Sequence, residues 1–389
     1  MSISFCFGTY RTTYKNPYHV EALNYALDNG ISNIDTSSNY MNGEAEILIG
    51  DAIKDRKRED LTIVTKGGYI QGETLQRILD GWKVNDLVNF DQTTLHCIDP
   101  DFLKEQITNS LERLNTNYID IYLLHNPEYY LMKNINQFSS KEDISYHQDI
   151  IQQRIRKAFK FLESDVKKGT IKGYGISSNS FSKSEEDIHF LEYRHLLKYA
   201  KEFGGNDHSF KVIQFPMNPF EIDGEAAGIW AKQNGIEVQI NRPLNAISQN
   251  EMLRLASYDE CEELDKLLIQ MRQIEDDEMQ KLIGQLLEAK NNFAWAGQVD
   301  DMIDHQTVPF IIDHIKLEAK YYDLLYRFLR CYKKSVKHNL SKFTALRLNM
   351  TGSIDMQAIE FLKQKEYISK IFMGMRDKEY VKKVFSLYS

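Results

Sequence analysis

One stretch decides how this chain folds, and it reads Ile31-Ser32-Asn33-Ile34-Asp35-Thr36-Ser37-Ser38-Asn39-Tyr40-Met41-Asn42-Gly43-Glu44-Ala45-Glu46-Ile47-Leu48-Ile49-Gly50. It begins as a short apolar strand that ends in an acid, Asp35, and continues as a polar loop that carries Tyr40. A helix then opens with Glu44 and Glu46, whose negative charges suit the positive end of a helix dipole. Strand, functional loop and helix form the repeating unit of a parallel α/β fold.

The same alternation recurs along the chain. The first helix is expected behind Asn16-Pro17 and ends at Asn29-Gly30, because proline suits the first helical position and glycine suits the end. Apolar segments of strand length lie at 5–7, 31–34, 61–65, 118–124, 171–176, 210–215, 236–240 and 368–372. Eight strands alternating with helices predict an α/β fold of the (β/α)8 TIM barrel type.

The alternation is interrupted once, by a helical insertion after the seventh strand. Residues 248–340 contain no convincing strand, and their apolar residues recur every three or four positions, which is typical of amphipathic helices. We therefore expect barrel units one to seven over 1–247, the insertion over 248–340 and the completion of the barrel over 341–389. The insertion has three interpretations: a lid over the barrel mouth, a surface for homo-oligomerisation, or a packed helical layer with no further role.

Composition and net charge limit the classes of protein to which this chain can belong. The 389 residues are 42% hydrophobic and 27% charged, which indicates a globular chain, and the net charge of −8 argues against a nucleic-acid surface. No run of about 18 apolar residues occurs, and the N-terminus lacks the pattern of a signal peptide, so we expect a cytoplasmic protein without membrane association. The cysteines show no metal-ligand spacing, so we expect no metal site and free thiols at Cys6, Cys97, Cys261 and Cys331.

Polar residues follow several of the predicted strands. Asp35 and Tyr40 come after the second strand, Lys66 ends the third and His125 follows the fourth. Because the C-terminal ends of barrel strands face one mouth, we expect these four side chains to converge. Asp35 would keep the lysine charged, the lysine would lower the pKa of the phenol, and the imidazole would orient a carbonyl oxygen while Tyr40 donates a proton to it. This set lacks a reductant, so a hydride donor must be supplied, and nicotinamide is the plain candidate.

The ordered motifs resemble those of the aldo-keto reductase superfamily. The resemblance covers about 1–246 and 341–386. Its motifs are Asp35-Thr36-Ser37-x-x-Tyr40-x-x-Gly43-x-x-Glu46-x-x-Ile49-Gly50, the strand ending in Lys66, Leu123-Leu124-His125, Tyr174-Gly175-Ile176-Ser177-Ser178-Asn179, Val212-Ile213-Gln214 and Arg242-Pro243-Leu244. The resemblance implies that Tyr40 is the general acid/base, that Lys66 and Asp35 tune it and that His125 orients the carbonyl.

The resemblance also implies a binding site for NADP, with NAD as the alternative cofactor. Ser177, Ser178 or Asn179, together with Gln214, would hold the nicotinamide carboxamide. Asn241 stands where the family usually has a tyrosine that stacks on the nicotinamide, and Arg376 would bind the 2′-phosphate. The expected cofactor-binding residues are Ser177, Ser178, Asn179, Gln214, Asn241, Arg242, Pro243, Leu244, Gly374 and Arg376.

The resulting hypothesis is an oxidoreductase that reduces an aldehyde or ketone to an alcohol, or catalyses the reverse reaction. Two alternatives stay open: non-redox proton transfer by an isomerase, dehydratase or lyase, and a non-catalytic sensor or scaffold. Residues 67–98 look irregular and belong to the expected substrate loops. The aromatic residues of these loops either line a pocket for an apolar, sugar or polyketide-like ligand or simply pack; they are Tyr69, Trp82, Tyr129 and Tyr130.

Overall fold

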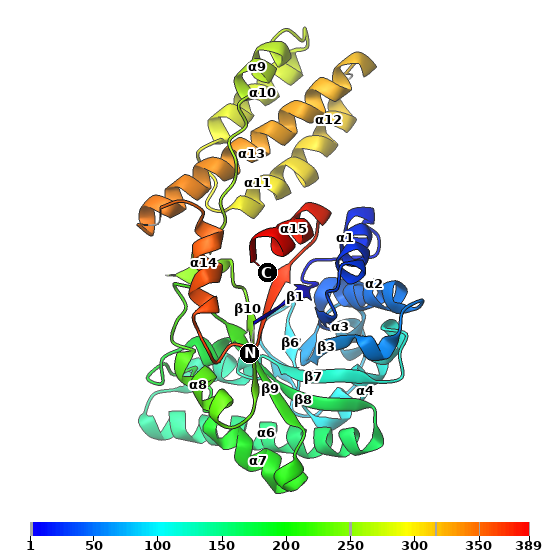
Figure 1. Ribbon diagram of the computed structural model, residues 1–389, viewed down its shortest axis with the longest axis vertical. Helices are drawn as coiled ribbons and strands as arrows, with labels where there is room; N and C mark the ends of the chain where they lie inside the picture. Colours follow the sequence, from blue (N-terminus) through cyan, green and yellow to red (C-terminus); the bar gives the residue numbers. More distant parts are fainter. Residues whose placement is uncertain (1–2, 249–250, 316, 350, 389) are drawn as a thin grey trace. The chain divides into compact units, whose positions relative to one another are not determined.

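Eight parallel strands close into a barrel (Figure 1) in the order β1-β13-β10-β9-β8-β7-β3-β2. This computed structural model describes residues 3–248, 251–315, 317–349 and 351–388. The predicted (β/α)8 barrel is confirmed, and each of the eight predicted strands is present. Their bounds are β1 Ser4–Gly8, β2 Asn33–Asp35, β3 Thr62–Gly67, β7 Ile119–His125, β8 Ile171–Ser177, β9 Phe210–Pro216, β10 Glu237–Asn241 and β13 Lys370–Gly374.

Helices connect the barrel strands, and the first begins as its sequence predicts. The Asn16 side chain accepts a hydrogen bond from the Tyr18 N–H, and Pro17 occupies the first turn. The helices of the barrel are α1 Pro17–Asp28, α2 Glu44–Ile53, α4 Pro100–Arg113, α5 Tyr129–Asn134, α6 Lys141–Lys168, α7 Arg194–Gly204, α8 Glu225–Gln233 and α15 Lys378–Lys383. Helix α14 Ile354–Lys363 precedes β13 and only its last residues, from Phe361, belong to the barrel unit.

The barrel interior is filled by side chains. Cys6, Val64, Leu123, Val212 and Phe372 form one buried cluster, contributed by β1, β3, β7, β9 and β13. Such layers are the usual packing of a TIM barrel, whose chemistry then belongs to the strand ends.

A small sheet lies in the segment that the sequence indicates to be irregular. Strands β4 Tyr69–Ile70, β6 Leu95–His96 and β5 Val88–Asn89 pair in that order, and α3 Gly72–Leu79 lies between β4 and β5. Two-residue strands are too short to show an alternation of apolar and polar residues, which is why the sequence pattern missed them.

The chain divides into two compact units, Met1–Pro243 with Phe361–Ser389, and Leu244–Glu360. The second unit contains the hairpin β11 Asn245–Ser248 and β12 Glu251–Arg254, so the expectation of no strand after 248 was wrong. Its helices are α9 Leu264–Met271, α10 Asp277–Ala289, α11 Ala296–Met302, α12 Val308–His314 and α13 Tyr322–Arg347. Helix α13 crosses the expected boundary at 340, because Leu340, Phe343 and Leu346 keep helical spacing with no Gly or Pro among them.

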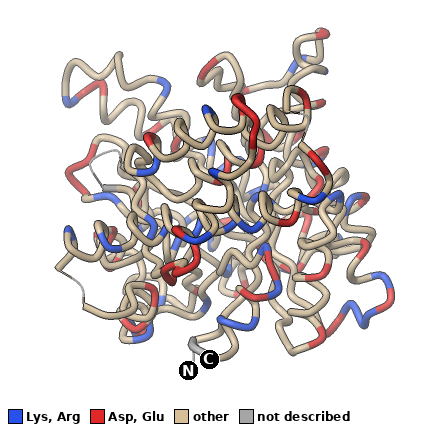
Figure 2. The backbone as a smooth tube through the Cα atoms, turned by 90° about the horizontal axis from the view of Figure 1, so that it is seen from above, with Lys and Arg blue, Asp and Glu red and all other residues tan. Residues whose placement is uncertain are grey.

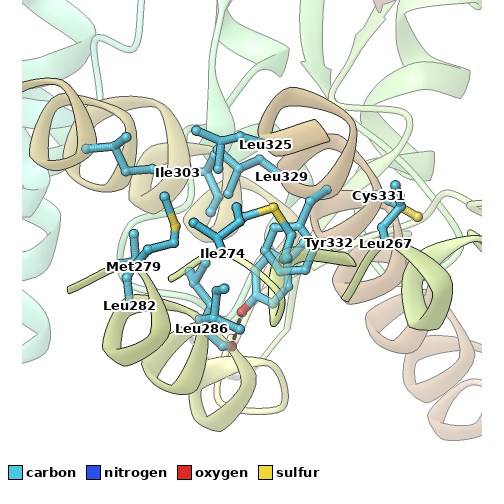
Figure 3. Packing of buried hydrophobic residues seen from close by; sticks show 14 of the residues in the cluster. Leu267, Ile274, Met279, Leu282, Leu286, Ile303, Leu325, Leu329, Cys331 and Tyr332 are labelled. Carbon is cyan, nitrogen blue, oxygen red and sulfur yellow. Dashed lines mark hydrogen bonds between the residues drawn. The ribbon is translucent and has the colours of Figure 1, made fainter. Parts of the chain in front are cut away.

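The second unit has a hydrophobic core of its own (Figure 3). Leu267 from α9, Leu286 from α10 and Leu329 from α13 belong to it, and the Tyr332 hydroxyl donates to the Leu286 carbonyl at 2.5 Å. Cys261 and Cys331 form a disulfide, so the expectation that all four cysteines are free thiols was wrong. Cysteines 70 residues apart give no sequence signal of their pairing, because packing alone brings them together.

Charges of both signs are interspersed along the backbone (Figure 2), so the net charge of −8 is not confined to one segment. None of the described helices combines the length and the apolar character that a bilayer crossing requires.

Candidate active site

A tight left-handed turn directly follows Tyr40 in the loop after β2. Met41, Asn42 and Gly43 have φ angles of 50°, 55° and 90°, a conformation that only glycine adopts at no steric cost. A Cβ atom on Gly43 would lie 2.7 Å from Cδ of Arg113. Arg113 in turn forms an ion pair of 2.7 Å with the fully buried Glu46 of α2. The turn is therefore fixed from both sides, by backbone conformation and by packing.

Lys66 is the centre of the polar group at the barrel mouth. Its side chain is fully buried, and Nζ donates to Oδ2 of Asp35 at 2.7 Å and to the Thr36 carbonyl at 2.8 Å. Nζ also lies 3.4 Å from the Tyr40 hydroxyl. Burial lowers the pKa of Lys66, while the charge of Asp35 opposes that change.

The pKa of Tyr40 moves in the direction opposite to the one expected from the sequence. Burial, followed by the charge of Asp35, raises the pKa of Tyr40 well above 10, although the Lys66 ammonium is close. The expectation considered the neighbouring charge and left out the desolvation of the half-buried phenol. Tyr40 is consequently a protonated phenol at neutral pH, which is the form that donates a proton.

His125 ends β7 beside these groups. Its Nδ1 lies 3.0 Å from the Ser37 hydroxyl, and its ring lies edge-on to Tyr40 with a centroid distance of 6.1 Å. Burial, with the charge of Lys66 as a second cause, lowers the pKa of His125 well below 6.5, so the imidazole is neutral at pH 7. The Ser37 hydroxyl donates to Oδ1 of Asn39 at 2.6 Å, and in the His125 tautomer protonated at Nε2 that N–H group is a donor for a carbonyl oxygen. The structure thus brings together all four residues proposed as catalytic.

Several of the residues proposed to bind a cofactor form one hydrogen-bonded chain. Gln214 accepts from the Ser177 hydroxyl at 3.0 Å through Oε1 and donates to Asp35 at 2.8 Å and to Gln239 at 3.2 Å through Nε2. Asn241 donates to the same Gln214 oxygen at 3.4 Å. Within the described residues, the buried Oδ1 of Asn241 has no hydrogen-bond partner. A carboxamide N–H donor is what this oxygen lacks, so the residues present fit the amide of a nicotinamide.

The other proposed cofactor residues lie in different surroundings. Ser178 is buried and its hydroxyl donates to Glu128 at 2.9 Å, whereas Asn179 is exposed. Arg242 forms an ion pair of 2.6 Å with Glu221. Pro243 and Leu244 are buried where the barrel unit ends, Gly374 closes β13, and the exposed Arg376 follows it before α15.

Aromatic side chains surround His125 on the side of the small sheet. Tyr69 lies 4.7 Å from the His125 ring and 5.1 Å from the Tyr129 ring, both measured between centroids. Trp82 and Tyr130 lie elsewhere: Trp82 packs on Phe102, and Tyr130 hydrogen-bonds His147 at 2.9 Å.

Sequence reasoning missed two buried residues beside the site. The Nε2 atom of His96 lies 2.7 Å from the His125 carbonyl oxygen, and burial lowers the pKa of His96 to about 4. Glu128 follows His125 by three residues and is 1% exposed. Neither belongs to a recognisable motif, since Glu128 looks like an ordinary acid at the start of a helix. Within the described residues, no group of three or more His, Cys, Asp or Glu side chains is arranged to hold a metal ion.

A model of the aldo/keto reductase family matches residues 4–244. Aldo-keto reductase YhdN of Bacillus subtilis is 36% identical over 110 residues, which is 28% of each chain. The NADH-specific methylglyoxal reductase of Escherichia coli is 31% identical over 99 residues, which is 25% of this chain and 27% of that protein.

A longer match is glycerol 2-dehydrogenase (NADP(+)) of Saccharomyces cerevisiae, 26% identical over 61% of this chain and 64% of that protein. The chain thus spans less than two thirds of the length of these three relatives. Among solved structures, aldo-keto reductase AKR11C1 from Bacillus halodurans covers 97% of this chain and 84% of its own, with a TM-score of 0.51 and 16% identity. The glycerol dehydrogenase AKR11B4 from Gluconobacter oxydans covers 99% and 86%, with the same TM-score and identity. The two structures share the fold.

Proposed function

The chain belongs to the aldo/keto reductase family, and from that premise we propose that it is a nicotinamide-dependent oxidoreductase that interconverts a carbonyl compound and its alcohol. The observation that carries the proposal is the buried contact of Lys66 with both Asp35 and Tyr40, beside a neutral His125. Bound nicotinamide would supply the hydride. The four side chains would donate the proton to the substrate and bind its oxygen atom.

In the proposed reduction, His125 holds the substrate oxygen through Nε2–H and Tyr40 protonates it. The proton moves from the Tyr40 hydroxyl to the oxygen as negative charge develops there. Lys66, 3.4 Å from that hydroxyl, then stabilises the phenolate, and Asp35 holds Lys66 in place. Ser177, Gln214 and Asn241 would hold the carboxamide.

NADP is the proposed cofactor, with NAD as the alternative. The exposed Arg376, directly after β13, is suited to a bidentate contact with a 2′-phosphate. Two of the relatives are named for different cofactors, one for NADH and one for NADP(+). Membership of the family therefore does not determine which of the two cofactors this chain binds.

The test replaces the proposed acid. Purified protein is assayed with NADPH and NADH against a panel of aldehydes and ketones, and Tyr40→Phe is expected to lower kcat by at least about 100-fold because it removes the proton donor. Tyr332→Phe is the matched control, since it removes a buried hydroxyl in the core of the second unit and is expected to keep kcat. Unchanged activity in Tyr40→Phe would refute the proposal. Failure of the wild-type protein to bind either cofactor would favour non-redox proton transfer instead.

A further inference from the structure

Glu128 ties the loop after β7 to the loop after β8. It directly precedes α5 and is 1% exposed. Its Oε2 accepts from the Ser178 hydroxyl at 2.9 Å, and its Oε1 accepts from the Asn179 N–H at 2.8 Å. The Ser178 oxygen itself accepts from the Ser180 N–H at 3.0 Å. The carboxylate therefore closes the turn that follows Ser177.

A second link joins the same two loops. The Asn126 N–H donates to the Ser177 carbonyl at 2.7 Å, and His125 pairs with Ser177 in the register of β7 and β8. The loop of the proposed carbonyl-orienting histidine and the loop of the proposed amide-binding serine are thus held together at several points. A substitution at Glu128 that moves the turn at 177–180 would therefore also move the backbone of Ser177.

We propose that Glu128 is a positioning residue whose negative charge holds the turn at 177–180 in the form that binds the nicotinamide cofactor. This inference rests on the proposed function. The ionised carboxylate accepts both the Ser178 and the Asn179 hydrogen bonds. When protonated, its oxygen facing Ser178 must donate, so the Ser178 hydroxyl has to turn away and the turn loses a charge-assisted contact.

The surroundings place this change of charge close to neutral pH. No ion pair of Glu128 with a lysine or arginine is present among the described residues, and burial raises its pKa to about 7. The contacts from Ser178, Asn179 and Ser180 oppose that rise. The titratable groups that face it are the phenols of Tyr69 from β4 and Tyr129 from α5, whose own pKa values are raised by burial, so both stay neutral. Glu128 is then charged above pH 7 and neutral below it.

The test measures cofactor affinity rather than turnover. The Kd for NADPH is measured by calorimetry from pH 5.5 to 8.5 for the wild-type protein and for Glu128→Gln, which resembles the protonated acid. Because the 2′-phosphate of the cofactor also titrates in this range, the decisive quantity is the ratio of the variant Kd to the wild-type Kd. We expect a ratio of about ten at pH 8.5, which corresponds to one hydrogen bond to a charged group, and a ratio near one at pH 5.5.

Glu163→Gln is the matched control. Glu163 is also buried and accepts from a hydroxyl and an N–H group, those of Tyr174 at 2.9 Å and Ser209 at 2.7 Å, and it makes no contact with the turn at 177–180. Its Kd ratio is expected to be independent of pH. A ratio for Glu128→Gln that is constant with pH, or an equal loss of affinity in Glu163→Gln, would overturn the inference.

A second pair of variants covers the case in which Glu128→Gln does not fold. Ser178→Ala removes a donor that favours the charged carboxylate, so the midpoint of the pH dependence should move to higher pH, and Ser178→Thr should restore it. An unmoved midpoint in Ser178→Ala would refute the inference while leaving the reductase assignment intact. Absence of NADPH binding by the wild-type protein at every pH would overturn the proposed function, and this inference with it.

Discussion

Burial sets the charge states of single residues at the barrel mouth. It raises the pKa of Tyr40 and lowers those of His125 and His96, in each case against the charged form. Burial lowers the pKa of Lys66 as well, but there an ion pair of 2.7 Å with Asp35 opposes the effect. Removing one member of such a buried pair leaves an uncompensated charge, so both are expected to be needed for folding as well as for activity.

Stability should fall in acid because two buried histidines resist protonation. The native pKa of His96 is about 4, against about 6.5 when unfolded, so below pH 6.5 the unfolded state binds more protons and stability decreases toward pH 4. Replacing His96 by Gln should make the dependence of the unfolding free energy on pH shallower, by up to about 1.4 kcal/mol per pH unit in that window. Urea unfolding from pH 7.5 to 4.5 measures the slopes.

His305→Gln is the comparison for that measurement, since His305 is largely exposed and should leave the slope as in the wild-type protein. Equal slopes for the wild-type protein and His96→Gln would contradict the assignment of His96 as a buried neutral imidazole. His125 keeps part of the slope in either case, because its pKa is lowered in the same direction.

At the scale of elements, the barrel strands were predictable and the small sheets were not. The long parallel strands β7, β8 and β9 are buried along most of their length, so they appear in the sequence as largely apolar runs, and β7 and β8 end in the polar residues His125 and Ser177. The hairpin β11–β12 and the two-residue strands β4 to β6 lack that length.

The same contrast holds for the candidate site. Asp35, Lys66 and His125 could be found because each occupies a strand end or adjoins one. Glu128 and His96 could not, since their environment depends on loops that only the folded chain brings together.

The turn after β2 offers a test at this scale. Gly43→Ala combines a φ of 90° with a Cβ that would meet the Arg113 side chain at 2.7 Å. We expect it to destabilise the protein by about 2–3 kcal/mol and to lower kcat, because Tyr40 begins this turn. Gly30→Ala, at a φ of 97° with nothing within 4 Å of its Cβ, should show only the backbone strain of about 1–2 kcal/mol and keep kcat. Thermal unfolding measures the loss of stability and steady-state kinetics measures kcat for both variants. Equal effects of the two substitutions would refute the packing argument.

At the scale of the whole molecule, the chain consists of two units that each bury a core. The sequence indicates the existence of the second unit by the loss of strand alternation, and its interior by apolar residues at helical spacing. Its end at Glu360 and its disulfide required the structure. A self-contained core agrees with each of the three interpretations of the insertion, and we propose the lid first because the chain enters it after β10, at the mouth of the barrel.

Reduction should weaken the second unit selectively. The Cys261–Cys331 bond closes a loop of 70 residues, so breaking it is expected to lower the stability of that unit by about 2–4 kcal/mol. Urea unfolding with and without dithiothreitol measures the change, and Cys331→Ser should no longer respond to the reductant. Thiol titration after denaturation should find two thiols without reduction and four with it, because Cys6 and Cys97 are free. Four thiols in the oxidised protein would contradict the pairing.

The orientation of the Gln214 amide has a consequence for which residues this position tolerates. Its oxygen faces two donors, Ser177 and Asn241, while its nitrogen faces two acceptors, Asp35 and Gln239. Rotating the amide by half a turn would set like against like at Asn241, Asp35 and Gln239, while the Ser177 hydroxyl could turn to accept. A glutamate of the same shape would place a second carboxylate against Asp35, and only one of the two could ionise at neutral pH. A proton would then compete with the Lys66 ammonium for the negative charge of Asp35. Position 214 is therefore expected to accept glutamine and to reject glutamate, although the two side chains have the same shape.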